Sequence, residues 1–387
     1  MLPPNKKIGI IGGGQLGKML IEAGQPWNVH YTILETQSAP AADIANKHIV
    51  GDLMDAGKIK ELAAECDVLT YEIEHINVEA LLELEKSGKR IIPSPAILRI
   101  IQDKGLQKLF FRDQDIPTTE FEIAENPSQW MDKLLKLRGE KIAAKLRKGG
   151  YDGKGVELVN KSDMMNFHDR IPFREPVVLE EFVENAVELS VIVARTEKGE
   201  ISTFPTVEMQ FDPVANLVEF LFAPADISPA IEEKARRIAM ETISKLNGAG
   251  IFAVEMFLDQ DHNIFVNEVA PRPHNSGHHT IEACYTSQYE QLNRILLDLP
   301  LGSTGLVKPA AMINLLGFEG ITGAYEITGL DKILKLEGVY IHLYNKASTK
   351  PKRKMGHVTI LGDTIAEVKE KASTVKQFLG MKQRLAL

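Results

Sequence analysis

The sequence predicts a multidomain protein of mixed α/β and α+β class. Its 387 residues exceed two ordinary domains of about 150 residues each. Strand-like and helix-like segments alternate over residues 1–95, which is typical of a small parallel α/β domain. Beyond residue 96 strands gather without that alternation, which indicates an α+β domain over 96–299 and a small β-rich domain over 300–387.

Composition and charge exclude several classes of protein. The net charge of −8 gives no global positive field for nucleic acid or an anionic membrane, so any phosphate recognition must be local. Cys66 and Cys284 are too isolated for a disulfide framework or a cysteine-based zinc site, which fits a reducing cytoplasm. No apolar run reaches the roughly 18 residues of a membrane span. We therefore expect a cytoplasmic protein with no nucleic-acid or membrane partner.

A glycine motif opens the N-terminal domain. The apolar run 8–11 is followed by Gly12-Gly13-Gly14-Gln15-Leu16-Gly17 and a helix-like segment, and a second strand covers 31–34. Glycines at the start of such a helix expose backbone N–H groups that suit a phosphate. The motif is compatible with a dinucleotide whose ribose Glu35 would hold, with another phosphate ligand, or with tight packing alone. Prolines at 93 and 95 mark the end of this domain.

The second domain carries another glycine-rich segment. Strand-like segments flank Lys148-Gly149-Gly150-Tyr151-Asp152-Gly153-Lys154-Gly155, whose backbone donors and two lysines suit a triphosphate. The segment lacks the spacing of a Walker A loop, and a polar hairpin turn is the alternative. Lys145, in the preceding apolar strand, needs an anion if it points inward, or lies in solvent at a strand edge.

Two carboxylates face each other in a predicted hairpin after the amphipathic helix 229–246. Its arms, 251–258 and 264–269, flank turn residues and place Glu255 almost opposite Glu268. Paired carboxylates in apolar surroundings repel unless a cation joins them, and Mg²⁺ bridging to nucleotide phosphates is the natural cation. A salt bridge to Arg272 is the alternative.

Polar side chains crowd the segment that follows the hairpin. Ala270-Pro271-Arg272-Pro273-His274-Asn275-Ser276-Gly277-His278-His279 combines stiffening prolines with varied polar groups, which indicates a site. Zinc is disfavoured, because no cysteine or helical histidine pair accompanies these histidines. Further on, the basic run 350–354 is a solvated loop or an anion site.

Four motifs together resemble the ATP-grasp superfamily and, within it, the family of N5-carboxyaminoimidazole ribonucleotide synthetases of purine biosynthesis. They are the segment 12–19, the loop 149–155, the run 266–278 and Arg353-Lys354-Met355-Gly356-His357. The third is close to a signature of the family. The resemblance spans nearly the whole chain.

The resemblance implies a Rossmann-like N-terminal domain, an ATP-grasp domain that clamps ATP, a small C-terminal β domain and a homodimer. Metal ligands, for Mg²⁺ or Mn²⁺, would be Glu255 and Glu268. Residues binding ATP would be Lys104, Lys145, Gly150, Tyr151, Asp152, Gly153, Lys154, Gly155, Val156, Glu180, Glu181, Phe182, Val183, Glu188, Asn267 and Glu268. Residues binding the ribonucleotide would be Gly14, Gln15, Leu16, Glu74, Arg272, His274, Asn275, Ser276, Arg353 and Lys354. Catalytic roles would fall to Lys145, Arg272, His274 and Asn275.

The reaction that the resemblance implies is ATP-dependent carboxylation of 5-aminoimidazole ribonucleotide by bicarbonate, through carboxyphosphate, with release of ADP and phosphate. Another ATP-grasp ligase, of the formate-dependent glycinamide ribonucleotide transformylase or biotin carboxylase type, is the nearer alternative. A nicotinamide-dependent dehydrogenase built on the first glycine motif is the farther one.

Overall fold

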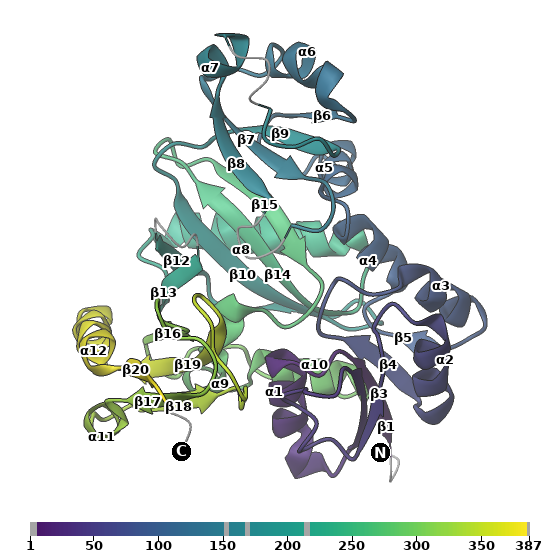
Figure 1. Ribbon diagram of the computed structural model, residues 1–387, viewed down its shortest axis with the longest axis vertical. Helices are drawn as coiled ribbons and strands as arrows, with labels where there is room; N and C mark the ends of the chain where they lie inside the picture. The colour runs from purple at the N-terminus through teal and green to yellow at the C-terminus, as the bar shows by residue number, and fades with distance from the viewer. Residues whose placement is uncertain (1–5, 151–154, 167–170, 213–216, 385–387) are drawn as a thin grey trace.

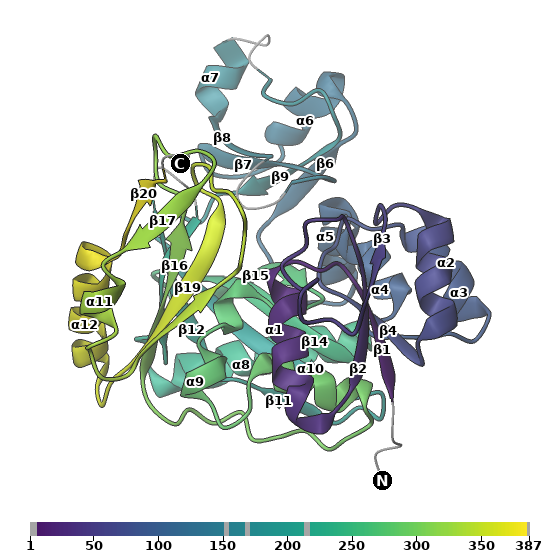
Figure 2. The ribbon, with the colours of Figure 1, turned by 60° about the horizontal axis from the view of Figure 1, so that its bottom comes forward.

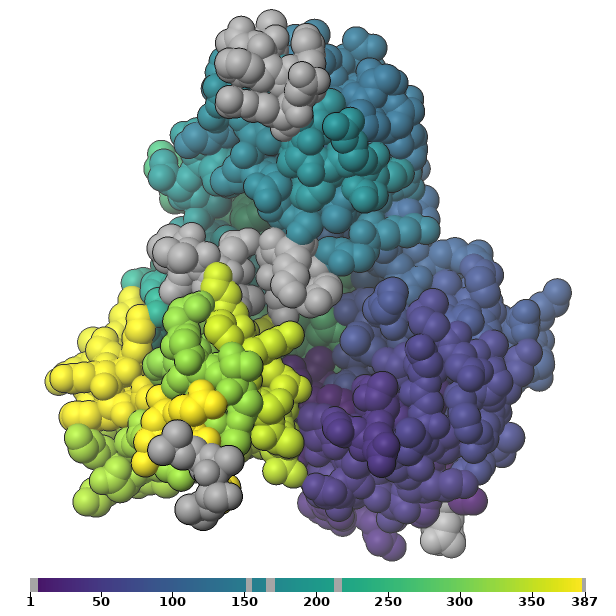
Figure 3. All heavy atoms as spheres, in the orientation of Figure 1, coloured from purple at the N-terminus to yellow at the C-terminus, as the bar shows by residue number. Residues whose placement is uncertain are grey.

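A computed structural model describes residues 6–150, 155–166, 171–212 and 217–384 (Figure 1). The N-terminal residues, in purple, form one lobe, and the C-terminal residues, in green to yellow, form a second lobe beside it. A third lobe, in blue to teal, stands above both, as the space-filling view shows (Figure 3). No helix within the described ranges has the length and apolar character needed to cross a membrane.

The N-terminal lobe is a parallel sheet with strand order β3-β2-β1-β4-β5. Helices connect β1 to β2, β3 to β4 and β4 to β5, which agrees with the predicted alternation, whereas among the described residues no helix lies between β2 and β3. The glycine motif lies between β1 and α1, with β4 on the other side of β1 from β2. The elements are β1 (Lys7–Ile11), α1 (Gln15–Gly24), β2 (His30–Glu35), β3 (Lys47–Val50), α2 (Ala56–Glu65), β4 (Val68–Tyr71), α3 (Val78–Lys86) and β5 (Arg90–Ile91).

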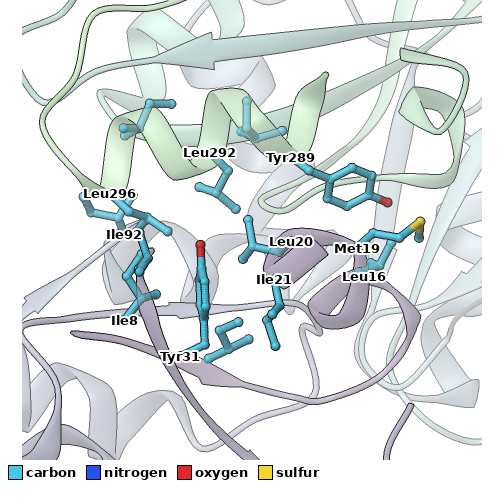
Figure 4. Close-up of a cluster of buried hydrophobic side chains, with 14 of the residues drawn as sticks. Ile8, Leu16, Met19, Leu20, Ile21, Tyr31, Ile92, Tyr289, Leu292 and Leu296 are labelled. Atoms are coloured by element: carbon cyan, nitrogen blue, oxygen red, sulfur yellow. The ribbon is translucent and has the colours of Figure 1, made fainter. Parts of the chain in front are cut away.

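A buried apolar cluster joins this lobe to the middle of the chain. Helix α1 packs on α10 (Gln288–Leu296), and Leu16, Leu20 and Leu292 lie in the contact (Figures 2 and 4). The hydroxyl of Tyr31 donates to Asn293 Oδ1 at 2.8 Å, so the buried phenol is satisfied across the same contact. The glycine motif is therefore held against the middle domain by a continuous core.

Two helices begin the middle part of the chain, α4 (Pro95–Ile101) and α5 (Lys104–Asp113). Asp103 separates them because its carboxylate accepts hydrogen bonds from the backbone N–H groups of Gly105 (2.9 Å) and Leu106 (3.2 Å). A short acidic side chain that caps a helix in this way fixes where the helix begins. The break places Lys104 at the first turn of α5.

The upper lobe is an antiparallel sheet with strand order β6-β9-β7-β8. Trp130 and Ile142 lie in the core between this sheet and its helices. The second glycine-rich segment connects β7 and β8, so a strand follows it, as predicted. The elements are β6 (Phe121–Ala124), α6 (Trp130–Leu134), β7 (Lys141–Leu146), β8 (Val156–Asn160), α7 (Lys161–Asn166) and β9 (Val177–Glu181).

A long antiparallel sheet runs through the middle and C-terminal parts of the chain, in the order β15-β14-β10-β12-β13-β16-β19-β18. Strand β13 pairs with β16, so the two predicted domains share one sheet. Helix α8 (Pro229–Leu246) begins and ends as predicted. The strands are β10 (Val187–Arg195), β11 (Ile201–Thr203), β12 (Val207–Asp212), β13 (Leu217–Ala223), β14 (Gly250–Leu258), β15 (Ile264–Ala270), β16 (Ala310–Leu316), β18 (Val339–Leu343) and β19 (Lys354–Leu361).

The C-terminal lobe also contains a helix that the sequence analysis did not predict. Helix α12 (Ile365–Phe378) packs on β16 and β19 through Val368, Ala372 and Val375. The chain also forms the short elements α9 (Thr280–Ala283), β17 (Tyr325–Thr328), α11 (Leu330–Ile333) and β20 (Gly380–Gln383).

Candidate active site

Two carboxylates stand opposite each other at the centre of the molecule. Strands β14 and β15 form the predicted hairpin, and Glu255 is the cross-strand partner of Glu268. Burial and the Glu268 and Glu188 carboxylates raise the pKa of Glu255 to about 8. Lys104 pairs with Glu268 and lowers its pKa below the usual range. One carboxyl group of the pair is thus protonated while the other is charged, as expected of two adjacent acids.

The alternative of a salt bridge from Arg272 to this pair does not occur. Arg272 instead pairs with Glu74, with Nη2 2.8 Å from Oε1. The cation at the hairpin is Lys104, whose pKa burial would lower but Glu268 raises. The helix break at Asp103 puts Lys104 there, and no local sequence pattern predicts that contact.

A buried ion cluster borders the carboxylate pair. Glu180 on β9 lies 2.7 Å from Lys108 Nζ and 3.0 Å from Lys145 Nζ. Burial alone would raise the pKa of Glu180, but the two lysines bring it down to about 2. Burial lowers the pKa of Lys108 to about 8. A small cavity lies here, lined by Lys104, Gln107, Lys108, Lys145, Glu180, Asn267 and Glu268.

Lys145 points inward, as one of the two predicted alternatives has it. Its ammonium group also donates to Asn267 Oδ1 at 2.7 Å, so it reaches from β7 to β15 and connects the upper lobe to the carboxylate hairpin. Only 12% of its side chain is exposed. Lys145 therefore joins Glu180 on β9 to the hairpin strand that carries Glu268.

The other residues expected to bind ATP lie around this cluster. Gly150, Gly155 and Val156 border the β7–β8 connection, whereas Tyr151, Asp152, Gly153 and Lys154 lie outside the described residues. Glu181 is the last residue of β9, and Phe182, which is 38% exposed, and Val183 follow it. Glu188 lies on β10, and burial raises its pKa to about 7.

The imidazole ring of His274 contacts Glu255 of the carboxylate pair. Its Nε2 atom is 3.2 Å from Glu255 Oε1, and its Nδ1 atom is 2.8 Å from Ser276 Oγ. Burial, together with Arg272 and Lys354, holds the pKa of His274 well below its ordinary value, so the ring is neutral. Ser276 is fully buried, which favours a supporting role over the substrate contact expected from the resemblance.

Asn275 is also engaged within the protein. Its amide exchanges two hydrogen bonds with the amide of Asn314 on β16, at 2.8 and 2.9 Å. A buried pair of this kind ties the segment 271–279 to the C-terminal lobe. The direct role in substrate orientation expected of Asn275 would require this pair to open.

The glycine motif holds a carboxylate that the sequence analysis missed. The backbone N–H groups of Gly14 and Gly17 both donate to the carboxylate of Glu72, the latter at 2.6 Å. Burial raises the pKa of Glu72, although these bonds favour its charged form. The donors expected for a substrate phosphate are thus occupied by a side chain of the protein. Gln15 and Leu16 open α1, and Leu16 faces the core.

The basic run contributes one residue near the site. Lys354 acts on the electrostatics of both His274 and His278, so its charge faces the segment 271–279. Arg353 Nη1 donates to Ser348 O at 2.7 Å, within its own loop. The structure therefore brings Lys354 toward the other predicted residues more closely than Arg353.

Histidine rings form a buried cluster between the segment 271–279 and the C-terminal lobe. The ring centroids of His278 and His357 are 4.6 Å apart, and those of His357 and His342 are 4.4 Å apart. The Nδ1 atoms of His278 and His357 each lie 2.9 Å from a tyrosine hydroxyl, of Tyr289 and Tyr344 respectively. Within the described ranges no group of three or more acidic, histidine or cysteine side chains is arranged to hold a metal ion.

The histidine cluster predicts acid sensitivity. Burial holds the pKa of His278 and His357 well below the ordinary value, so these rings stay neutral when folded. In the unfolded chain the same rings take up protons below about pH 6.5. Their contribution to the free energy of unfolding is therefore fully present above that pH and is lost as the pH falls. We expect the free energy of unfolding to fall by about 1.4 kcal/mol for each ring between about pH 7.5 and 5.5.

Denaturant unfolding at the two pH values measures this loss. The loss should shrink in His357→Gln and stay unchanged in His75→Gln, which alters an exposed histidine. An equal loss in wild type and His357→Gln would contradict the assignment of the acid sensitivity to this cluster.

The comparisons with known proteins agree with this arrangement. Residues 5–102 match the ribonucleotide synthetase preATP-grasp domain, 109–289 the ATP-grasp domain and 310–371 the phosphoribosylaminoimidazole carboxylase C-terminal domain. The N5-carboxyaminoimidazole ribonucleotide synthase of Synechococcus elongatus is 36% identical over 359 residues, which cover 92% of this chain and 90% of that protein. The chain belongs to the N5-carboxyaminoimidazole ribonucleotide synthetase family.

Solved structures support the same membership. The family's enzyme from Thermotoga maritima aligns with a TM-score of 0.88 and 42% identity, over 98% of this chain and 100% of that one. The enzyme from Aspergillus clavatus, in complex with ADP and 5-aminoimidazole ribonucleotide, aligns with a TM-score of 0.87 and 33% identity, over 96% and 98% of the two chains. The chain also spans about two thirds of the length of yeast and plant relatives named phosphoribosylaminoimidazole carboxylase.

Membership in the N5-carboxyaminoimidazole ribonucleotide synthetase family confirms three predictions: the family itself, the three-part fold and an ATP-dependent ligase that acts in purine biosynthesis. The glycine motif of residues 12–17 lies in a preATP-grasp domain. The dehydrogenase interpretation of that motif is therefore wrong.

Proposed function

We propose that this chain carboxylates 5-aminoimidazole ribonucleotide with bicarbonate, using ATP and releasing ADP and phosphate through carboxyphosphate. The observation that carries the proposal is the pairing of Glu255 with Glu268 beside the partly buried cations Lys104 and Lys145. Phosphoryl transfer to bicarbonate requires the negative charge of the transferred phosphoryl group to be neutralised. Lys104 and Lys145 supply positive charge at this place, and the two carboxylates supply oxygen ligands for a metal ion.

The carboxylate pair fits a divalent cation. Two facing carboxylates disfavour each other's charge, as the raised pKa of Glu255 indicates. Mg²⁺, or Mn²⁺, takes oxygen ligands from one or two carboxylates and completes its shell with phosphate oxygens and water. Glu255 and Glu268 would hold the ion, which when bound would neutralise charge on the transferred phosphoryl group. Lys104 would then leave Glu268 and turn toward the nucleotide.

The remaining roles follow from position. Lys145 would place its charge on the triphosphate, since it projects from the upper lobe into the cavity. Arg272, which lies just after β15 and pairs with Glu74, would orient bicarbonate. Glu72 and Lys354 would face the ribonucleotide, the former presented by the glycine motif and the latter by β19.

An assay of ADP release tests this proposal. We expect release only when bicarbonate and 5-aminoimidazole ribonucleotide are both present, and incorporation of labelled bicarbonate into an acid-labile product. Glycinamide ribonucleotide with formate, and biotin, serve as the rival acceptor systems. Faster turnover with either rival would contradict the proposal.

We also propose that the protein is a homodimer that works in the cytoplasm. Both cysteines, Cys66 and Cys284, are buried free thiols, which suits a reducing compartment. Sedimentation velocity at micromolar concentration tests the dimer, and a species of about 43.0 kDa at all concentrations would contradict it.

A further inference from the structure

A chain of hydrogen bonds leads from the core of the large sheet to Glu255. Ser190 Oγ on β10 lies 2.8 Å from Ser276 Oγ, which lies 2.8 Å from His274 Nδ1. The opposite edge of the same ring, Nε2, is 3.2 Å from Glu255 Oε1. Ser190 and Ser276 are fully buried, so neither hydroxyl touches solvent.

The sheet itself fixes the two ends of this chain. Ser190 and Glu255 are cross-strand partners of β10 and β14. The backbone of His274 is also held, because its N–H donates to Gln288 Oε1 at 2.9 Å and its carbonyl accepts from Gln288 Nε2 at 2.8 Å. The imidazole ring of His274 therefore lies between two side chains, of Ser190 and Glu255, whose strands are paired in one sheet.

The contacts fix which ring nitrogen of His274 carries a hydrogen. The backbone N–H of Ser276 points at His274 Nδ1, at 3.3 Å, so this nitrogen must accept. A hydrogen on Nδ1 would face that N–H and leave the Ser276 N–H without an acceptor. The ring must carry its hydrogen on Nε2, where it donates to Glu255. The hydroxyl of Ser276 then donates to Nδ1 and accepts from Ser190.

We propose that Ser190 and Ser276 are positioning residues, which hold His274 as the Nε2–H tautomer so that it fixes the orientation of the Glu255 carboxylate for the metal ion. The proposal rests on the proposed function, because it takes Glu255 as a metal ligand. Residues that hydrogen-bond to metal ligands typically change metal affinity by about ten- to a hundredfold when removed. The sequence alone does not single out Ser190, which lies 86 residues before its partner.

Binding of Mn²⁺ in the presence of ADP, followed by the electron paramagnetic resonance of free Mn²⁺, tests the proposal without turnover. We expect Ser190→Ala to weaken Mn²⁺ binding by about tenfold. Ser276→Ala should act similarly, and the double variant should be little worse than either single one, because both act through His274. The control, Ser202→Ala, removes a serine hydroxyl on the neighbouring strand β11 that contacts Thr304, and should bind Mn²⁺ as wild type does.

Nitrogen-15 spectra of the imidazole rings in the metal-free protein give a second, independent readout. The His274 signal, assigned by its loss in His274→Gln, should be that of an Nε2–H tautomer in wild type. In Ser190→Ala it should shift toward a mixture of tautomers. An Nδ1–H ring in wild type would overturn the proposal even if a serine variant failed to fold.

Different results would contradict the metal site at Glu255 and Glu268 and the positioning role of Ser190 and Ser276. Glu268→Gln should abolish Mn²⁺ binding whatever the serines do. Normal Mn²⁺ binding in Glu268→Gln would overturn the metal site, and with it the proposal. Loss in Glu268→Gln together with unchanged binding in both serine variants would overturn the proposal alone.

Discussion

Glu268→Gln is expected to lower ATP turnover by at least about a hundredfold, the scale for losing a group that stabilises transition-state charge. The amide keeps the shape of the side chain but removes the charge that would bind the metal and that now pairs with Lys104. The fold should survive, because 39% of the Glu268 side chain and 23% of the Lys104 side chain are exposed to water. ADP release at saturating Mg²⁺, with thermal unfolding alongside, measures both effects.

A matched carboxylate separates this effect from a general loss of charge. Glu290→Gln removes an acid on α10 that pairs with Arg294 at 2.8 Å, outside the candidate site, and should leave turnover unchanged. Glu255→Gln should also reduce turnover, because it removes the other carboxylate of the facing pair. Near-normal turnover in Glu268→Gln would contradict the metal assignment.

The parts of the site that could be predicted from sequence are those set by local geometry. The hairpin of β14 and β15 follows from two strand-like runs around a short turn, and that alone brings Glu255 opposite Glu268. Lys145 was predictable as a cation in an apolar strand, although its contacts with Glu180 and Asn267 were not. Those contacts join strands that are more than thirty residues apart in the sequence. Hydrophobic periodicity is a local signal and does not predict which distant strands pair.

Glu72 was missed although a topological signal existed. In a parallel sheet the carboxyl ends of neighbouring strands lie at the same edge. Strand β4 is the neighbour of β1, so the first residue after β4 lies beside the glycine motif after β1. Glu74 was predicted for the site instead, because the glycine motif alone does not give the strand order. Glu74 does reach the site, through Arg272.

Histidines and serines were harder to place, because their roles depend on packing between lobes. His274, Asn275 and Ser276 were expected to meet substrate, but their polar groups meet Glu255, Asn314 and Ser190. Buried polar groups require partners, and these partners come from three different strands. Residue type and spacing in the segment indicate a polar site but do not say which groups face inward.

The second large effect is expected from a pair of substitutions that separates the role of the N-terminal glycine motif from that of the ion cluster around Lys145. Gly14→Val should raise the requirement for 5-aminoimidazole ribonucleotide strongly, because a Cβ at Gly14 would lie 2.6 Å from Glu72 Oε1 and displace that carboxylate. ATP affinity should barely change, since the ion cluster is built from other strands.

Lys145→Met should have the opposite effect, weakening ATP binding by about ten- to a hundredfold through loss of a charge-assisted contact of roughly 1.5–3 kcal/mol. Glu180 keeps Lys108 at 2.7 Å, so the buried carboxylate retains one cation and the fold should persist. Equilibrium binding of each ligand to each variant gives four measurements. If Gly14→Val abolished ATP binding while Lys145→Met left it intact, the nucleotide would have to bind at the N-terminal glycine motif, because only there would the lost contact lie.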